Sequence, residues 1–288
     1  CFLIFYIYNM ASGRVFYHKE YWKFALKFNI PLIPHYLSMT VLNSADRIMI
    51  SNMVGDNEAG IYNLAYQVSM VMTMFNTALM QTIEPWLYKK IKEHRIKDMA
   101  NVAYPTFVAI AVLNILLIAF APEIIALFAP VEYTDAIWVI PPIAMSAYFM
   151  FAYTFFAVFE FYFSKTKFIS VATMVGAVLN VILNYILIDK FGYIAAGYTT
   201  LLCYIIYAIC HYICMKKICK NYLKNQNPYS TKVLMIITIC FILIGFVCLV
   251  TYTNVWIRYA LIIVITLSGI LQRKKVMAFA KELMSLRK

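Results

Sequence analysis

The chain has 288 residues, of which 64% are hydrophobic and 13% are charged, and its mean hydropathy is +0.75. Soluble globular domains are nearer half apolar and one quarter charged, so this composition excludes a soluble protein and indicates that lipid surrounds most of the chain. The net charge of +12 would suit a nucleic-acid partner, but no such partner is needed once the basic residues are placed along the chain.

The chain begins inside an apolar segment. Residues 1–10 predict the end of a truncated transmembrane helix, because the apolar run already starts at Cys1. We therefore expect the chain to be the C-terminal portion of a longer protein. Residues 11–29 alternate basic and aromatic side chains, which predicts an interfacial helix on the cytoplasmic leaflet. Pro31 and Pro34 then bend the entry into the next segment.

Eight longer apolar segments follow, each close to the roughly 20 residues that cross a bilayer as a helix. We expect transmembrane helices at residues 30–52, 60–83, 101–121, 137–160, 168–188, 194–215, 233–253 and 257–271. A basic loop at 216–232 separates the sixth span from the seventh, and a basic tail at 272–288 follows the eighth. The sequence thus predicts an all-α integral membrane protein.

Basic residues lie on alternate connections between these spans. Of the 25 Lys and Arg residues, 22 fall in the segments 11–27, 89–98, 164–167, 216–232 and 272–288. The intervening connections are short and contain one basic residue, Lys190. Because basic connections stay in the cytoplasm, this pattern predicts that the five basic segments and the C-terminus are cytoplasmic. It also accounts for the positive net charge.

Two neighbouring charges, Asp46 and Arg47, interrupt the first full span. On a helical wheel they lie about 100° apart and share one side of the helix with His35 and Asn43. A charge at the centre of a bilayer costs about 2.5–3.5 kcal/mol, so this side must face a bundle interior or a wet cavity. Two interpretations stay open, a structural polar network between helices and a cavity site for a charged substrate or a coupling ion.

The second span also carries polar residues. Asn63 and Gln67 lie one turn apart, where they either join helices or bind sugar hydroxyls. Glu84 lies near the cytoplasmic end, and we favour a pair with Lys89 or Lys90 at the interface over a coupling site.

Later polar residues favour structural roles. We expect Glu160 to be interfacial, close to Lys165. The repeat of Gly176, Asn180 and Asn184 every four residues predicts a helix contact. Cys210, His211 and Cys214 suggest a metal cluster, but their helical spacing inside a span favours packing. The sequence contains no Gly-rich phosphate loop, GxSxG or HExxH motif, so we expect neither an enzyme nor a cofactor.

Two stretches resemble a known family. The run ALKFNIPLIPHYLSMTVLNSADRIMISNMVGDNEAGIYNLAYQVSMVMTMFNTALMQTIEPWLYKK is similar to the start of the second half of bacterial Wzx-type polysaccharide and O-antigen flippases. FGYIAAGYTTLLCYI is similar to a later Gly-Ala-rich stretch of that family, with the order Ala-Ala-Gly where Gly-Ala-Ala is commoner. Together the resemblance covers roughly residues 20–220. These flippases form the oligosaccharide-lipid branch of the MATE-like MOP superfamily.

The resemblance implies a transporter of two six-helix bundles around a central cavity. Residues 30–215 would form the second bundle and residues 233–271 two additional helices, with about six spans missing upstream. The family moves polyprenyl-diphosphate-linked oligosaccharide across the bacterial inner membrane by alternating access. Its partners would be membrane lipids and a coupling proton or sodium ion, without nucleic acid. A cationic cavity would suit Arg47.

Three alternatives remain open. An ion-coupled multidrug or cation exporter of the same superfamily would line its cavity with acidic and aromatic residues. A membrane-embedded polysaccharide polymerase would need a long outer loop with catalytic charges, whereas the longest outer connection here is PEIIALFAPVEYTDA. A scaffold without transport activity would not need charges within its spans.

Overall fold

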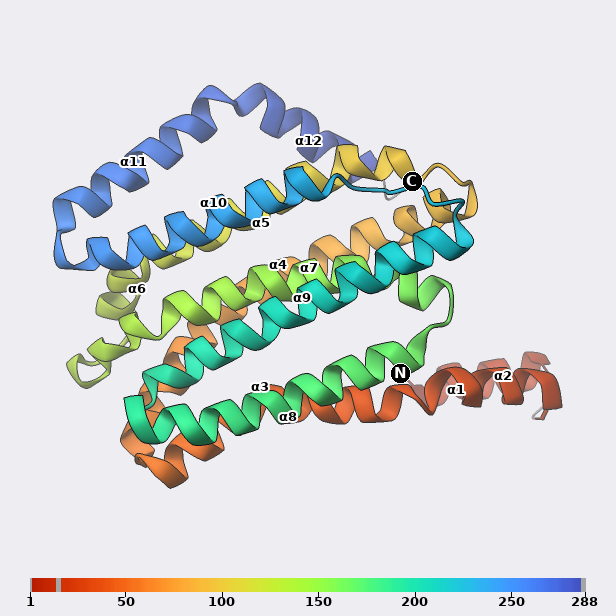
Figure 1. Cartoon of the computed structure of the whole chain (residues 1–288), viewed down its shortest axis with the longest axis horizontal. Helices are drawn as coiled ribbons and strands as arrows, with labels where there is room; N and C mark the ends of the chain where they lie inside the picture. Colours follow the sequence, from red (N-terminus) through yellow and green to blue (C-terminus); the bar gives the residue numbers. More distant parts are fainter. Residues whose placement is uncertain (1, 14–16, 286–288) are drawn as a thin grey trace.

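The computed structural model describes residues 2–13 and 17–285, and every regular element within these ranges is a helix (Figure 1). The predicted all-α class is confirmed. Residues 1, 14–16 and 286–288 lie outside the described residues. The predictions made for the start of the first segment, for part of the interfacial segment and for the end of the basic tail are therefore not tested at these positions.

The helices, in chain order, are α1 (Phe2–Gly13), α2 (Lys19–Asn29), α3 (Leu32–Met53), α4 (Asp56–Lys92), η1 (Ile96–Asp98), α5 (Met99–Ala119), α6 (Ala121–Phe128), η2 (Val131–Trp138), α7 (Ile140–Tyr162), α8 (Thr166–Phe191), α9 (Ile194–Tyr222), α10 (Thr231–Val250), η3 (Thr251–Thr253), α11 (Val255–Leu271) and α12 (Arg273–Ser285). The eight segments expected to cross the membrane correspond to α3, α4, α5, α7, α8, α9, α10 and α11.

Two helices continue beyond their apolar runs. α4 has 37 residues and ends in a basic turn that contains Lys89, Lys90 and Lys92. α9 has 29 residues and extends into the basic segment after residue 215. Basic side chains interact favourably with the C-terminal end of a helix dipole, so these turns stay helical after the sequence has become polar. The apolar pattern marks only the part of each helix that suits lipid.

Five helical segments of the described chain are long and apolar enough to cross a membrane, and a sixth qualifies if α11 and α12, which meet at a 69° bend, count together. The five are α5 together with η1, α7, α8, α9, and α10 together with η3. α3 and α4 have 22 and 37 residues but are less apolar, because they carry the polar side chains described below.

The basic segments gather at one end of the molecule. Figure 1 shows α2, the connection between α4 and α5, the α7–α8 turn, the connection between α9 and α10, and the end of α12 at the same end of the bundle. The less basic connections lie at the opposite end. This arrangement is the one that the alternating charge pattern requires of a multi-pass membrane protein.

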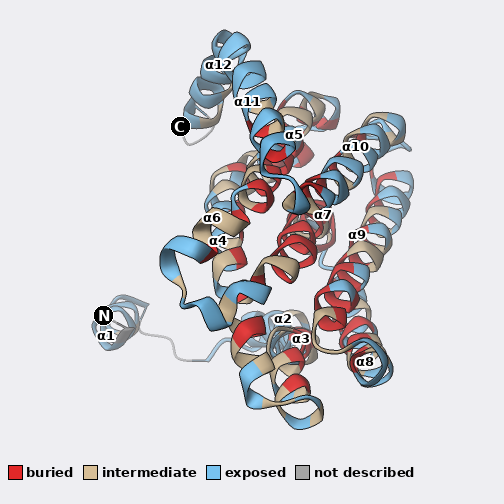
Figure 2. Cartoon of the chain, turned by 90° about the vertical axis from the view of Figure 1, so that its left-hand side faces the viewer, coloured by how far each residue is buried: buried red, intermediate tan, exposed pale blue. Residues whose placement is uncertain are grey.

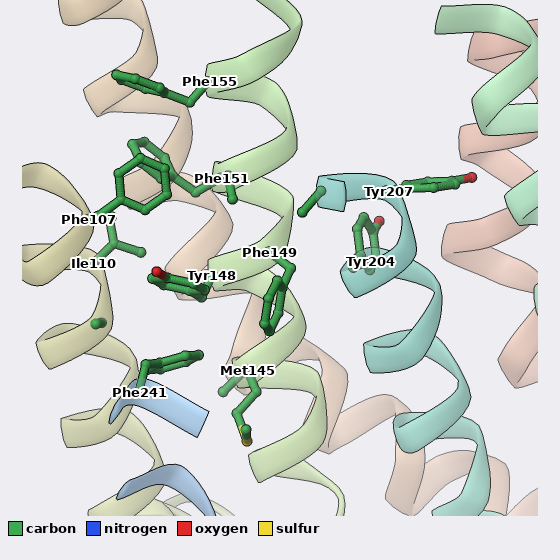
Figure 3. Close-up of a cluster of buried hydrophobic side chains, with 14 of the residues drawn as sticks. Phe107, Ile110, Met145, Tyr148, Phe149, Phe151, Phe155, Tyr204, Tyr207 and Phe241 are labelled. Atoms are coloured by element: carbon green, nitrogen blue, oxygen red, sulfur yellow. The ribbon is translucent and has the colours of Figure 1, made fainter. Parts of the chain in front are cut away.

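α7 is the central helix of the bundle, and 18 of its 23 residues are buried (Figure 2). Figure 3 shows aromatic side chains of α7 packed against Phe107 of α5 and Phe241 of α10. The Phe107 ring centroid lies 5.3 Å from that of Phe151 and 5.4 Å from that of Phe155, both at steep angles. Such edge-to-face pairs contribute about 0.5–1.5 kcal/mol each beyond area burial, so they help to fix how α5 packs on α7.

A glycine brings α8 and α9 close together. A Cβ atom added to Gly176 would lie 1.9 Å from the Tyr207 ring, so no larger residue fits without movement. The Tyr207 hydroxyl donates a hydrogen bond of 2.7 Å to the backbone carbonyl of Thr173. This close contact explains why a glycine begins the repeat of Gly176, Asn180 and Asn184. The two asparagines lie on the same side of α8 and are buried in the bundle.

Candidate functional site

The buried face of α3 positions the first part of the site. Its buried residues recur every three or four positions and are Leu32, His35, Ser38, Leu42, Asp46 and Ile50. Only 2% of the Asp46 surface is exposed. Because neighbours on a helix point about 100° apart, Arg47 projects away from this face and is only partly buried. The polar side of α3 that the sequence predicts is thus divided between the bundle interior and a pocket.

Asp46 is held by donors from three other helices. Its Oδ2 accepts hydrogen bonds of 2.7 Å from the Tyr62 hydroxyl of α4 and 2.7 Å from the Thr200 hydroxyl of α9. Its Oδ1 accepts a hydrogen bond of 2.6 Å from the Asn184 amide of α8. No Lys, Arg or His of the described chain lies within 4.0 Å of the carboxylate as a salt-bridge partner. Neutral donors alone compensate its burial.

Further oxygen atoms surround this carboxylate. The Asn184 amide also donates to Asn180 Oδ1 at 3.3 Å, and Asn180 donates to the Thr200 hydroxyl at 3.4 Å. Thr199 donates a short hydrogen bond to the Asn184 side-chain oxygen. A buried carboxylate among neutral amide and hydroxyl groups can bind a proton or a hard cation such as Na⁺, for which oxygen is the preferred ligand.

Arg47 lies beside the Asp46 network but is not paired with it. One guanidinium nitrogen donates to Asn63 Oδ1 at 3.0 Å and another donates to the Asn43 backbone carbonyl at 2.7 Å. The guanidinium carbon lies 4.9 Å from the centre of the Tyr66 ring. No acidic side chain of the described residues forms a salt bridge with Arg47. The positive charge is therefore oriented by neutral groups and not neutralised.

A pocket of about 140 Å³ lies between α3, α4, α7 and α9. Asn43 and Tyr66, which contact Arg47, both line it, and Thr200 of the Asp46 network lines it too. The Tyr66 and Tyr204 hydroxyls point to Asn43 Oδ1 at 3.4 and 3.5 Å. The complete lining is Leu42, Asn43, Tyr66, Ser69, Met70, Thr73, Ile143, Ser146, Ala147, Met150, Thr200 and Tyr204, with no acidic residue. The Thr200 hydroxyl thus connects the pocket directly to Asp46.

Three of the predicted site residues lie elsewhere. His35 is buried, and its Nδ1 lies 2.8 Å from the Thr173 hydroxyl. It precedes Asp46 by eleven residues on α3, which corresponds to about 16 Å along the helix axis. Gln67 is exposed, and no hydrogen bond joins it to the network. Glu84 accepts a hydrogen bond of 2.6 Å from the Tyr88 hydroxyl. The site gathers Asp46, Arg47, Asn43 and Asn63, and not these three.

The expected pairing of Glu84 with Lys89 or Lys90 is wrong. Lys90 instead forms a salt bridge of 3.3 Å with Asp98, which η1 brings back against the end of α4, and one of 3.9 Å with Glu93, three residues further along the chain.

The interfacial depth expected for Glu160 stays a prediction, since the residue lies near the end of α7, but the structure shows it buried inside the bundle. Its carboxylate oxygens lie 2.9 and 3.0 Å from His211 Nδ1, and both side chains are fully buried between α7 and α9. His211 therefore pairs with the Glu160 carboxylate. The described residues contain no cluster of three His, Cys, Asp or Glu side chains that could hold a metal ion.

Several residues of the network were not identified as site residues from the sequence. Tyr62, Thr199 and Thr200 carried no distinct signal in their own helices. Asn180 and Asn184 stood out by their spacing of four, but as packing residues. A sequence reading that treats buried asparagines on one stripe as possible partners of the single buried Asp would have found them.

Comparison with known proteins agrees with this architecture. A family model described as polysaccharide biosynthesis protein matches residues 1–90. The predicted resemblance is confirmed. Among curated relatives, an uncharacterized membrane protein of Methanocaldococcus jannaschii is 27% identical over 180 residues, covering 62% of this chain and 42% of that protein. A protein of Haloferax volcanii named as a probable low-salt glycan biosynthesis flippase is 24% identical over 170 residues, covering 58% of this chain and 36% of that protein.

The arrangement of helices is similar to that of a solved membrane transporter. A multidrug resistance MATE family transporter of the MOP superfamily, solved in an outward-facing conformation, superposes with a TM-score of 0.57 at 18% identity. The superposition covers 78% of this chain and 52% of that transporter. This chain spans less than half the length of the curated relatives it matches. At this identity the likeness concerns the arrangement of helices and not the transported molecule.

Proposed function

We propose that the chain forms part of a flippase that moves polyprenyl-diphosphate-linked oligosaccharide across a bacterial inner membrane for surface polysaccharide synthesis. The observation that carries the proposal is the charge of Arg47, which no acidic residue pairs, held against Asn43 and Tyr66 of a pocket whose lining contains hydroxyl and amide groups and no acidic residue. A guanidinium binds diphosphate oxygens through paired hydrogen bonds, and Asn63 and Tyr66 hold it ready for that geometry.

The pocket chemistry favours an anionic, hydroxyl-rich substrate over an organic cation. Each sugar hydroxyl moved through hydrocarbon without a partner would cost about 4–8 kcal/mol. Side chains such as Asn43, Thr73 and Ser146 supply hydrogen bonds along this wall. A cation exporter would need acidic groups in the pocket, whereas Asp46, the only carboxylate of the described residues that contacts the pocket lining, is buried and already accepts three hydrogen bonds.

The Asp46 network is proposed as the site of the coupling ion. Binding of a proton or Na⁺ neutralises the buried carboxylate, and loss of the ion leaves the charge with neutral donors from α4, α8 and α9. Because Thr200 contacts both Asp46 and the pocket, occupation of the ion site changes the wall that contacts the substrate. Such shared contacts provide the differential interaction that alternating access requires.

We further propose that α3, α4 and α11 cross the membrane with the five more apolar segments, which gives eight spans with the C-terminus in the cytoplasm. Residues 30–215 would then be the second bundle of a two-bundle transporter, and Arg47 would face the cavity between the bundles. The clustering of basic segments at one end supports this orientation.

The proposal is tested by complementation of a strain that lacks its own flippase with the complete gene product. We expect Arg47→Gln to abolish surface polysaccharide while membrane insertion stays normal, because the diphosphate loses its cationic partner. Arg47→Lys keeps the charge but not the fork of donors, so it should retain partial export.

Lys190→Gln is the matched control, since it removes one positive charge from an exposed position at the end of α8. Export at the wild-type level by well-inserted Arg47→Gln protein contradicts the proposed role. So does an equal loss in Lys190→Gln.

A further inference from the structure

A second pocket lies at the basic end of the bundle, separate from the Arg47 site. It has a volume of about 530 Å³ and lies between α2 and the turn that joins α7 to α8. Its lining combines three lysines with three phenylalanines, a serine and a threonine: Phe24, Lys27, Phe28, Ser164, Lys165, Thr166, Lys167 and Phe168. No acidic residue lines it.

The three lysines carry uncompensated charge. Within the described part of the chain, Lys27, Lys165 and Lys167 form no salt bridge. Lys165 instead lies over the Tyr222 ring, with its Nζ 4.9 Å from the ring centre. The nearest acid along the chain, Glu160, is fully buried against His211 and does not face the pocket. Because like charges repel, an anion that enters this cavity would interact favourably with all three ammonium groups.

The pocket has the features of a site at the membrane surface. α2 is amphipathic and has no buried residues, which is typical of a helix lying in the interface. Phe24 and Phe28 stack at 6.2 Å on its apolar side, next to Lys27. α8 begins at this pocket with Thr166, and no side chain caps its first turn. The lysines, the aromatic wall and the positive end of a 26-residue helix therefore converge on one volume.

We propose that this basic pocket binds the phosphate headgroup of an anionic membrane lipid, with the acyl or isoprenoid chain left in the bilayer beside α2. The shared chemistry is a phosphate or diphosphate ester at the cytoplasmic surface. Its source is either bulk phospholipid or the polyprenyl diphosphate carrier, and the experiment separates the two. The site does not depend on the proposed function, because binding is measured without transport.

The test is native mass spectrometry of the complete protein in detergent, titrated separately with phosphatidylglycerol, a polyprenyl diphosphate and zwitterionic phosphatidylcholine. We expect the triple variant Lys27→Gln, Lys165→Gln, Lys167→Gln to bind anionic lipid on the order of 100-fold more weakly, since each lysine at an anionic headgroup contributes roughly a factor of five. The triple Lys→Arg variant at the same positions should restore binding.

The matched control removes three lysines from α12, by Lys274→Gln, Lys275→Gln and Lys281→Gln, which are exposed and carry the same total charge. Its affinity should stay within about threefold of the wild type, because these positions do not line the pocket. If the pocket triple does not fold, the three single variants are titrated, each with an expected loss of about fivefold.

A loss with both anionic lipids supports a general phosphate site. A loss confined to one of them supports the site and identifies its lipid. Equal losses in the pocket and α12 variants, or wild-type binding of phosphatidylcholine as tight as that of the anionic lipids, overturn the proposal.

Discussion

Removal of the Asp46 carboxylate is expected to destabilise the bundle measurably. Asp46 accepts hydrogen bonds from Tyr62, Asn184 and Thr200 at 2.6–2.7 Å, and all four side chains are buried. Hydrogen bonds between membrane helices contribute about 0.6 kcal/mol on average and at most about 1.7, so three of them amount to roughly 2–5 kcal/mol for Asp46→Ala. Asp46→Asn keeps the volume and one acceptor oxygen, so it should fall between wild type and Asp46→Ala.

The assay is equilibrium unfolding of purified protein in mixed micelles with increasing SDS. Asp189→Ala is the control, because Asp189 is exposed at the end of α8. A second measurement compares NaCl with choline chloride. A sodium site at Asp46 predicts that NaCl stabilises wild type selectively and leaves Asp46→Ala unchanged, whereas equal stabilities in both salts leave the proton as coupling ion. The reasoning is refuted if Asp46→Ala is as stable as Asp189→Ala within about 0.5 kcal/mol.

Two further predictions concern the contacts between α7, α8 and α9. Gly176→Ala should lower the free energy of unfolding by about 1–3 kcal/mol, because its methyl group would collide with Tyr207, whereas Gly269→Ala, with no neighbour within 4 Å, should be neutral or stabilising. A smaller loss at Gly176 than at Gly269 contradicts the packing. His211→Ala should cost about 3–5 kcal/mol by leaving Glu160 buried and unpaired, and the double variant with Glu160→Ala should cost less than the sum of the single variants. Strictly additive losses would mean that the pair is not coupled.

The helices were predictable because lipid imposes a simple rule on the sequence. Every span must be a long apolar segment, and α7 and α10 follow that rule closely. Helix ends were less predictable, since α4 and α9 continue into basic turns that favour helix for a different reason. Apolar segments predict where a chain crosses lipid, not where a helix ends.

The site was predictable only in part. The position of Asp46 and Arg47 on the polar side of α3 follows from helical spacing, and so does the need of each charge for its own partner. The identity of those partners does not, because Asn184 and Thr200 lie 138 and 154 residues further along the chain. Helical periodicity gives the inward face of each helix but not which helices meet.

The burial of Glu160 was also not predictable from its own helix. Its place near the end of an apolar segment suggested an interfacial depth, but α7 is surrounded by other helices along nearly its whole length. Depth in the membrane and burial in the bundle are separate quantities, and the sequence of one helix reports only the first. Its partner His211 lies 51 residues away, on α9.

The most direct measurement is flipping by the complete purified protein in proteoliposomes. A fluorescent polyprenyl-diphosphate oligosaccharide is incorporated into both leaflets, and the fraction that becomes accessible to a membrane-impermeant quencher is followed over time. The account predicts that wild-type protein moves the labelled lipid between leaflets and that Arg47→Gln does not, with equal amounts of protein inserted. Quenching that stops at the outer-leaflet fraction with wild-type protein, under both sodium and proton gradients, would contradict it.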